Sequence, residues 1–284
     1  MWWEVTPCAK LTTLGRYGER YRMCSIWWLS VKWCEFGEWG KFVLAYWLEV
    51  LPLQYYTVWH CADGLMYRRR FDCLLQVVYF RIPSFIDQSK IPKKVCLHGV
   101  GYRHMCRFHA KTLYEQPILT RLQYIWRLDD DSCIMAPIGY DVFRLMRDRH
   151  IQYGYIKTGA DRPLKCIINF HSNVSAYVRK HGITPKMQWS YKYAFYNNFE
   201  LSDLNLWRSP EYQDYIDYID RIGGIFYHRW GDATIKTVAV TLLLSKKQIY
   251  RFKGIAYKHG RRLKFRYNLT ANDASKTGKI ITRW

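Results

Sequence analysis

The chain has 284 residues, of which 44 are Lys or Arg and 23 are Asp or Glu, so its formal net charge is +21. Apolar residues make up 49% of it and aromatic residues 18%, which excludes intrinsic disorder, because disordered chains lack the apolar side chains that build a core. A mean hydropathy of −0.30 argues against a polytopic membrane protein, and the most apolar stretch, residues 42–59, contains Glu49 and Pro52.

The positive charge is spread along the chain rather than gathered in one tail. It attracts polyanions in general, which include RNA, DNA, membrane surfaces and nucleotide phosphates. Residues 66–70 (MYRRR) and 247–253 (KQIYRFK) are the best candidates for a basic nucleic-acid-binding module, because they interleave aromatic and basic side chains. Neither forms a known nucleic-acid motif, so this function is a remote alternative and no nucleic-acid partner is expected.

The nine cysteines show neither a C-x-x-C pair nor zinc-finger spacing. We therefore expect mostly free, buried thiols, and the sequence does not decide whether one or two disulfides form. Met1 is followed by Trp2, Trp3 and Glu4 instead of a basic region and an apolar run, so no signal peptide or membrane anchor is visible.

Residues 1–54 differ from the rest: eight of the thirteen tryptophans lie within residues 1–59, where no regular period is visible. We leave residues 1–54 unassigned and expect a single α/β domain over residues 55–284, since strands alternate with helices there. Runs rich in β-branched and aromatic residues predict strands, and amphipathic runs predict helices. The expected strands are 55–61, 74–80, 124–128, 153–157, 166–170 and 237–244, and the expected helices are 140–150 and 210–222.

The clearest helix is 210–222. Ser209 is a good N-cap, Pro210 suits the first helical position, and Gly223 ends the helix. Three acids lie off its apolar stripe and are expected to be solvated and without function: Asp214, Asp217 and Asp220.

The expected strand 124–128 runs directly into Asp129, Asp130 and Asp131. Ligands bind at the carboxyl ends of strands in open α/β sheets. Two carboxylates spaced D-x-D can hold Mn²⁺ or Mg²⁺, which neutralises a leaving diphosphate. An acidic triplet alone is weak support for a metal site, because such triplets are common in loops.

Five blocks of sequence, taken in order, add to this signal. They read GYRHMCRF at 101–108, YIWRLDDD at 124–131, YNNFELSDLNL at 196–206, GGIFYHRWGDA at 223–233 and IAYKH at 255–259. In that order they resemble the fungal Golgi α-1,2-mannosyltransferases, the KTR family or glycosyltransferase family 15, whose pattern is similar to YRHMCRF, WRVEP, WSNFEI, GGFYYERWGDA and IGYxH. The resemblance covers roughly residues 55–260.

The resemblance implies a GT-A-like α/β domain with a mixed, mainly parallel central sheet flanked by helices. It implies a retaining transfer of mannose from GDP-mannose to a mannose hydroxyl, in α-1,2 linkage, with Mn²⁺. The expected partners are therefore a nucleotide-sugar donor and a mannosylated glycoprotein or glycolipid acceptor. The family works in the Golgi lumen, but without a visible anchor a cytoplasmic or other location stays open.

Three residues are candidate metal ligands, and two of them match the family's metal site. Asp129 stands where the family has a metal-binding Glu, Asp131 completes a D-x-D, and His259 stands at the family's metal-binding His. Without the resemblance, His259 would be one more surface imidazole beside Lys258.

Three further residues match donor and acceptor positions, and two arginines are candidate cations. Glu200 matches the family's candidate nucleophile or donor-face carboxylate, Tyr102 a donor-site tyrosine, and Asp232 an acceptor-site acid. Arg103 and Arg107 are expected as diphosphate-binding or structural cations, and Asp129 contributes to donor binding through the metal. The alternatives are a surface Glu200, a core Tyr102 and an Asp232 that pairs with Arg229.

The chain also departs from the family pattern. Asp129 replaces Glu, Asp130 replaces Pro, Thr234 replaces Pro, and Lys236 stands near a family His. The family's nucleotide-binding segment is not recognisable in residues 1–54. These departures keep open an alternative function, that of a catalytically impaired relative with an incomplete nucleotide site.

Overall fold

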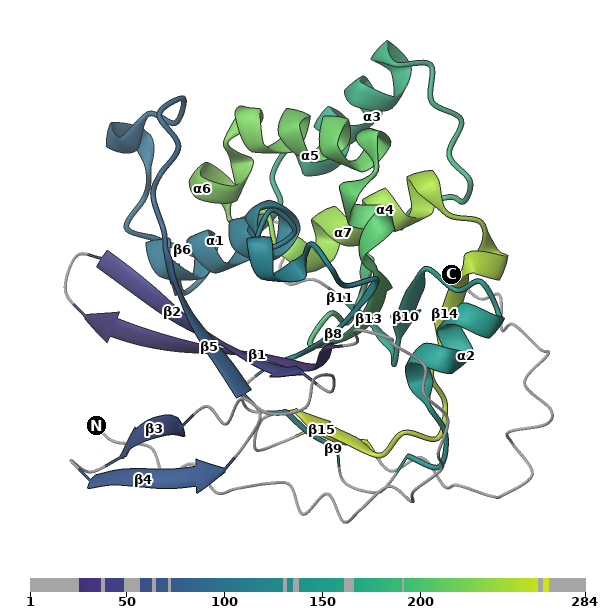
Figure 1. The fold of residues 1–284 in the computed structure, drawn as a ribbon. Coiled ribbons are helices and arrows are strands. Elements are labelled where there is room, and N and C mark those ends of the chain that lie inside the picture. The colour runs from purple at the N-terminus through teal and green to yellow at the C-terminus, as the bar shows by residue number, and fades with distance from the viewer. Residues whose placement is uncertain are drawn as a thin grey trace.

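A computed structural model gives the fold of the chain (Figure 1). It describes residues 26–36, 39–48, 57–62, 65–70, 73–129, 132–134, 138–160, 166–190, 192–259 and 263–265. A twisted central sheet lies between a large group of helices on one side and helix α2 (Val142–Asp148) on the other. No helix in the described part of the chain has the length and apolar character needed to cross a bilayer.

The central sheet has seven strands in the order β14-β10-β13-β8-β1-β2-β5. Its strands are β1 (Ile26–Phe36), β2 (Trp39–Leu48), β5 (Cys73–Tyr79), β8 (Tyr124–Leu128), β10 (Tyr153–Tyr155), β13 (Phe199–Asp203) and β14 (Ile249–Arg251). Shorter strands form three two-stranded sheets: β3 (Thr57–Ala62) with β4 (Leu65–Arg70), β6 (Lys94–Val95) with β7 (His98–Gly99), and β11 (Thr158–Ala160) with β12 (Tyr193–Phe195). A three-stranded sheet places β15 (Tyr257–His259) between β9 (Ser132–Ile134) and β16 (Leu263–Phe265).

The sheet is mixed, as predicted, but the expectation that it is mainly parallel is wrong. Of its six described strand pairings, only β1 with β8 and β10 with β14 are parallel. The other four are antiparallel. A strand's local sequence predicts that it is a strand but does not predict which strand it pairs with or in which direction. Both depend on contacts between residues far apart in the chain.

Strand β8 separates two hydrophobic cores because alternate side chains of a strand point to opposite faces of the sheet. Tyr124, Trp126 and Leu128 pack with helix α2 in one core, whereas Ile125 packs with the large helical group in the other. Arg127 faces the same side as Ile125 and is also buried. Both faces of β8 are therefore covered, which explains its continuous apolar run and places one charged group under the helices.

Six helices form the large group. They are α1 (Val100–Arg107), α3 (Phe170–Lys180), α4 (Leu204–Arg208), α5 (Pro210–Ile222), α6 (Gly224–His228) and α7 (Asp232–Leu243), and a π-helical turn, Phe108–Thr112, continues α1. The helix predicted at 140–150 is α2, and the one predicted at 210–222 is α5, with Ser209 as its N-cap and Gly223 at a φ of +77° after its end.

Two predicted strands are wrong. The run 237–244 lies mostly in α7, which is buried on nearly all sides, so its sequence is apolar all round and resembles a buried strand. The run 166–170 is a turn that leads into α3: Asn169 has a φ of +59° and Phe170 begins the helix. In the first case tertiary burial outweighs the β propensity of the residues, and in the second the left-handed Asn169 turns the chain into the helix.

The prediction that the acids of α5 are all solvated is also wrong. Asp220 is 3% exposed and forms a bidentate ion pair with Arg107 of α1, with Arg107 Nη2 2.7 Å from Asp220 Oδ2. Asp217 pairs with Lys111, and Asp214 accepts a 2.6 Å hydrogen bond from Tyr177. These contacts attach α5 to α1 and α3.

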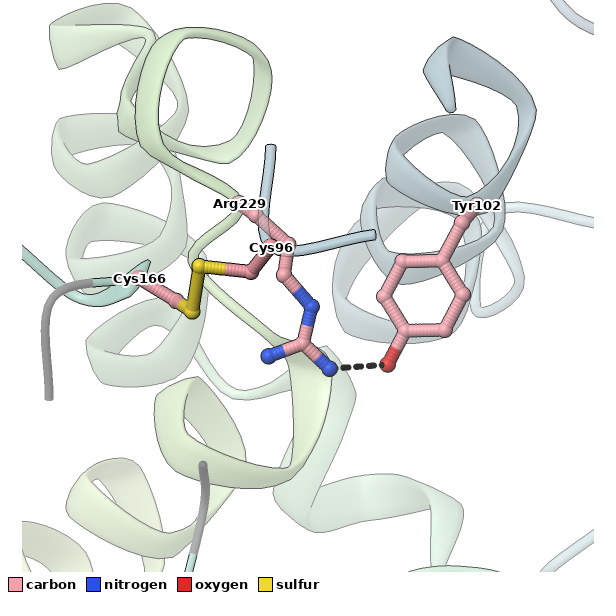
Figure 2. The surroundings of a disulfide bond; sticks show 4 residues. All are labelled: Cys96, Tyr102, Cys166 and Arg229. Carbon is pink, nitrogen blue, oxygen red and sulfur yellow. Dashed lines mark hydrogen bonds between the residues drawn. A yellow bond between two sulfur atoms is a disulfide. The ribbon is translucent and has the colours of Figure 1, made fainter. Parts of the chain in front are cut away.

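A disulfide joins Cys96, near the start of α1, to Cys166, near the start of α3 (Figure 2). It closes a loop of 70 residues in sequence. Cys106 is a free, buried thiol, as expected of most cysteines. The sequence allowed for one or two disulfides, and one is present.

Strands β1 and β2 lie within the Trp-rich region, yet their backbones extend the central sheet beyond β8. The strand predicted at 55–61 is β3, which forms a hairpin with β4 outside the central sheet, and the one predicted at 74–80 is β5. The division of the chain at residue 54 stays a prediction.

Candidate functional site

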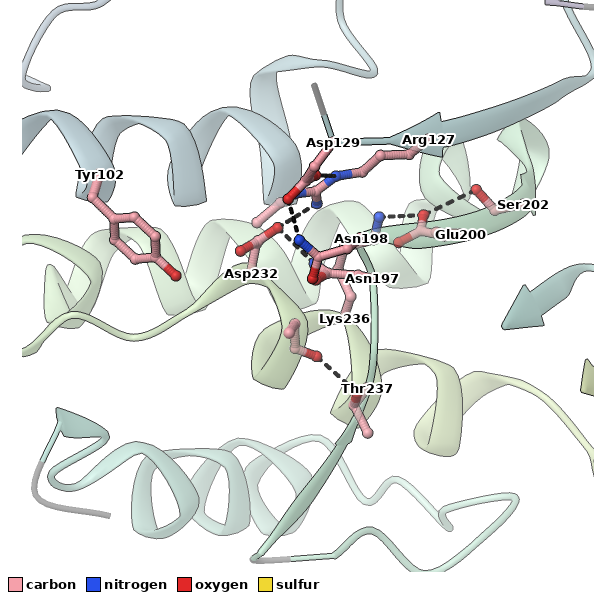
Figure 3. A network of polar contacts seen from close by, with 12 residues as sticks. Tyr102, Arg127, Asp129, Asn197, Asn198, Glu200, Ser202, Asp232, Lys236 and Thr237 are labelled. Carbon is pink, nitrogen blue, oxygen red and sulfur yellow. Dashed lines mark hydrogen bonds and ion pairs between the residues drawn. The ribbon is translucent and has the colours of Figure 1, made fainter. Parts of the chain in front are cut away.

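Polar side chains from four elements meet beside the carboxyl end of β8, and Figure 3 shows those next to β8 and β13 and on α7. Asp129 follows β8, Asn198 precedes β13, Asp232 opens α7, and His259 ends β15. Strand β8 pairs with β13 and strand β15 pairs with β9, so the sheets bring together residues up to 130 positions apart. This arrangement puts charged groups at the sheet edge where open α/β folds bind ligands.

Asp129 and His259 form the outer part of this cluster. Oδ2 of Asp129 lies 3.7 Å from Nε2 of His259, and the two side chains are 26% and 21% exposed. The amide Nδ2 of Asn198 lies between them, in contact with Asp129 Oδ2 and 3.0 Å from His259 Nε2. Two of the three predicted metal ligands are therefore adjacent and open to solvent.

The partners of His259 favour the tautomer that a metal needs. Nδ1 of His259 lies 2.6 Å from the hydroxyl of Tyr196. Because the Asn198 amide donates to Nε2, the ring proton belongs on Nδ1, which donates to Tyr196. Nε2 then carries the lone pair, which accepts from Asn198 and lies 3.7 Å from Asp129 Oδ2, and a hydrogen bond on the other ring nitrogen is the usual support of a metal-binding imidazole.

A carboxylate oxygen and an imidazole nitrogen are ligands that suit Mn²⁺ and other divalent first-row cations. The residues present thus fit such an ion, with Asp129 and His259 as its holders. Among the described residues no group of three His, Cys, Asp or Glu side chains converges as a complete metal cage. The third predicted ligand, Asp131, lies outside the described residues.

Arg127 connects the outer and inner parts of the site. Its Nη2 lies 3.2 Å from Asp129 Oδ1, and its Nη1 lies 2.5 Å from Asp232 Oδ2. Asn197 donates a 2.6 Å hydrogen bond to the same oxygen of Asp232. Burial, the largest single effect, raises the pKa of Asp232, but the neighbouring positive charges, with Arg127 the main contributor, and the hydrogen bond from Arg127 together outweigh burial and lower this pKa to about 2. Asp232 is therefore ionised at any physiological pH.

Asp232 does not use Arg229, which the sequence offered as an alternative partner. Arg229 lies over the ring of Tyr102 at 4.9 Å and donates a 2.9 Å hydrogen bond to its hydroxyl (Figure 2). Figure 3 shows Tyr102 on the same side of the cluster as Asp232. Arg229 has a φ of +58°, a left-handed conformation that is uncommon outside glycine and costs free energy.

Neither Arg103 nor Arg107 reaches the cluster. Arg103 is fully buried and donates to the backbone carbonyls of Pro92 and Phe226, while Arg107 pairs with Asp220. These two arginines were expected to bind the diphosphate or to have a structural role. Their contacts are those of a structural role.

Glu200 lies on β13 directly opposite Arg127 of β8. Its side chain is 1% exposed and is in contact with Nζ of Lys236 on α7, which is also 1% exposed. The carboxylate is thus enclosed between the sheet and α7, away from solvent, unlike that of Asp129.

Sequence reasoning missed four residues of this site. Arg127, Asn197 and Asn198 lie inside the matched blocks, so the blocks themselves were a signal for them. Lys236 lies outside every block and marks a departure from the family pattern, and only the folded chain shows its contact with Glu200.

Comparison with known proteins identifies relatives of the chain. The family model described as Glycolipid 2-alpha-mannosyltransferase matches residues 73–266. The probable mannosyltransferase KTR3 of Saccharomyces cerevisiae is 30% identical over 202 residues, which cover 64% of this chain and 50% of the relative. The probable mannosyltransferase MNT3 of Candida albicans is 33% identical over 227 residues, with coverages of 75% and 60%. The chain spans about half the length of the curated relatives it matches.

Two solved structures share the fold. The mannosyltransferase Ktr4p from S. cerevisiae in complex with GDP is 27% identical, with a TM-score of 0.57 over 63% of this chain and 52% of that one. Core-mannan synthase A from Aspergillus fumigatus, in its Mn/GDP form, is 24% identical, with a TM-score of 0.60 over 63% and 56%. These likenesses confirm the GT-A-type α/β fold.

Proposed function

Because the chain belongs to the glycolipid 2-alpha-mannosyltransferase family, we propose that it is a retaining α-1,2-mannosyltransferase. Its donor is GDP-mannose, its acceptor is a mannose hydroxyl on a glycoprotein or glycolipid, and its metal is Mn²⁺. The relative Ktr4p, solved in complex with GDP, supports the choice of nucleotide. The observation that carries the proposal is the adjacency of Asp129 and His259, 3.7 Å apart at the carboxyl end of β8.

We assign the holding of the metal to Asp129 and His259, with Asp131 as the third expected ligand. When bound there, the ion supplies positive charge that stabilises the leaving diphosphate. An ion held there would take the place of the Asn198 amide at Asp129 Oδ2 and His259 Nε2, whereas Arg127 would keep Asp129 in place through the other carboxylate oxygen, Oδ1.

Asp232 and Tyr102 bind and orient the sugars. Asp232 is held ionised by Arg127 and Asn197, so it accepts hydrogen bonds from acceptor hydroxyls. Tyr102, held by Arg229, lines the donor side. The described cluster holds three carboxylates, Asp129, Asp232 and Glu200, against two cations, Arg127 and Lys236, which leaves one negative charge.

A retaining transfer needs either an attacking group or a shielded cationic intermediate at the anomeric carbon. Glu200 is enclosed and uses Oε1 to bind Lys236 and Ser202. An enclosed carboxylate that is already bonded is better suited to stabilise positive charge than to attack, since its field acts without screening by water. We therefore assign Glu200 to the shielding of the anomeric centre.

The disulfide supports a lumenal compartment. Such bonds form and persist in oxidising compartments and are rare in the cytosol. Cys96–Cys166 therefore favours the Golgi lumen over a cytoplasmic location for this chain.

Thermal unfolding with nucleoside diphosphates tests the proposal. GDP with Mn²⁺ at about one hundred times its Kd stabilises the chain by about 2.7 kcal/mol, a readily measured rise in Tm. A rise with UDP instead of GDP would keep the class of enzyme and change the sugar. A cooperative transition that no nucleotide shifts would contradict the proposal and favour the catalytically impaired relative.

A further inference from the structure

The ion pair between Lys236 and Glu200 is the most deeply buried charged contact of the site (Figure 3). It joins α7 to β13, and each side chain is 1% exposed. Removing one partner of such a pair leaves an uncompensated charge in a low-dielectric interior, which is strongly destabilising. The two groups are therefore mutually dependent, in contrast to exposed pairs such as Arg144 with Asp148.

Aromatic rings enclose the ammonium group. Nζ of Lys236 lies 4.4 Å from the centre of the Trp207 ring and 5.3 Å from that of Tyr114. Trp207 also donates a 2.8 Å hydrogen bond to Ser202 Oγ, which donates in turn to Glu200 Oε1 at 3.1 Å. The same residue thus fixes the cation by its ring face and the carboxylate through Ser202.

Only one oxygen of Glu200 is used in these contacts. Oε1 accepts from Lys236 and Ser202, whereas Oε2 is buried and has no hydrogen-bond partner in the described structure. A buried acceptor without a partner costs free energy and needs an explanation. A carboxylate oxygen reserved for a substrate supplies one.

We propose that Lys236 is a positioning residue: it holds Glu200 through Oε1, and so leaves Oε2 as the oxygen that acts on the donor sugar. This inference rests on the proposed function, because it gives Glu200 its role toward the anomeric centre. It assigns a task to a lysine at one of the positions where the chain departs from its family's pattern.

The electrostatics of the pair agree with this geometry. Burial lowers the pKa of Lys236, and the Glu200 carboxylate opposes that effect. Burial also lowers the pKa of His109 well below its ordinary value, so this neighbour is neutral. The other titratable groups that face the pair are Arg127, Asp232, Tyr114, Tyr153 and Tyr212.

Lys236→Gln tests the proposal, because the amide retains a hydrogen-bond donor but lacks the charge. Without its counter-ion, a buried carboxylate is disfavoured relative to its neutral form, because burial penalises an unpaired charge. We expect kcat to fall about tenfold at pH 7 and to recover toward pH 9, with the KM for GDP-mannose unchanged.

Stability gives a second readout that does not need activity. A carboxyl whose folded pKa is raised stabilises the fold at low pH and loses that contribution as the pH rises through the folded pKa. The Tm of Lys236→Gln, relative to wild type, therefore falls between pH 5 and pH 8. The double variant Glu200→Gln/Lys236→Gln lacks this slope. Lys111→Gln, which loses a partly exposed pair with Asp217, is the matched control and shows neither effect.

The possible results distinguish a supported proposal from an overturned one. A single variant that unfolds at pH 7 while the double variant folds supports the proposal, because the unpaired charge is then the cause. A pH-independent loss of stability in both variants, or an unchanged kcat and pH profile in Lys236→Gln, overturns it. If the wild-type protein transfers no mannose but the variants show the expected Tm slopes, the proposed function is wrong. The electrostatic dependence of Glu200 on Lys236 is then still supported.

Discussion

At the scale of single residues, Asp129 uses its two oxygens for different partners. Oδ1 accepts from Arg127 and Oδ2 faces Asn198 and His259. The contact with Arg127 fixes the carboxylate. Oδ2 then lies beside the His259 imidazole, where the two side chains are expected to bind the metal. The sequence identified Asp129 and His259 through the matched blocks, but it could not show that Arg127 connects Asp129 to Asp232.

Replacing Asp129 by Asn tests its role. The amide keeps the shape but removes the negative charge, so metal-dependent transfer should fall by roughly a thousandfold, which corresponds to about 4 kcal/mol of transition-state stabilisation. Steady-state kinetics with varied Mn²⁺ measures this loss. Asp148→Asn, an exposed acid on α2, is the control and should keep full activity. Near-normal turnover in Asp129→Asn would refute the metal assignment.

Asp232 predicts a pH dependence of stability. Its folded pKa, about 2, lies below the ordinary Asp value of about 3.9, so its stabilising contribution is complete above the higher value and is lost as the pH falls toward 2. The loss amounts to about 2 kcal/mol. Urea unfolding of wild type and Asp232→Asn between pH 2 and 5 should show a shallower slope in the variant; parallel slopes would contradict the buried pair with Arg127.

At the scale of elements, local signals predicted α5 well and α7 badly. Helix α5 has an N-cap at Ser209, Pro210 in its first turn and a left-handed Gly223, all of which are readable in the sequence. Helix α7 is buried on nearly all sides and rich in β-branched residues, so its sequence carries no amphipathic period. Its helical form depends on burial by the sheet and by neighbouring helices, which no local pattern contains.

The cap of α5 gives a prediction at this scale. Oγ of Ser209 accepts a hydrogen bond from the backbone NH of Tyr212 at 3.2 Å. Ser209→Ala should lower the free energy of unfolding by about 1 kcal/mol, whereas Ser209→Thr should retain most of it. Urea denaturation measures both variants. Equal stability of the Ala variant and wild type would show that the cap contributes nothing.

At the scale of the whole molecule, the disulfide closes a loop of 70 residues between α1 and α3. In the chain-entropy model such a crosslink stabilises the fold by about 4 kcal/mol. Cys166→Ser should lose most of this stability, and reductant should destabilise wild type by more than it destabilises the variant. Urea unfolding with and without reductant tests this. A wild-type midpoint that reductant leaves unchanged would contradict the crosslink.

The arrangement of the whole sheet was the least predictable part of the fold. The strand at 124–128 was readable, but its antiparallel partner β13 is more than 70 residues away and its parallel partner β1 lies in the region left unassigned. The family blocks supplied the fold class, since they place several residues at once. They could not supply Lys236, because its partner is set by the packing of α7 against β13.

The most direct test of the proposed transferase is the reaction itself. Wild-type protein with GDP-mannose, Mn²⁺ and methyl α-mannoside should form a disaccharide that NMR identifies as α-1,2-linked, with retention at the anomeric carbon, and chelation of the metal should stop it. Absence of product from a folded protein that binds GDP would contradict the account and leave the chain as a family member that binds the nucleotide without transferring the sugar.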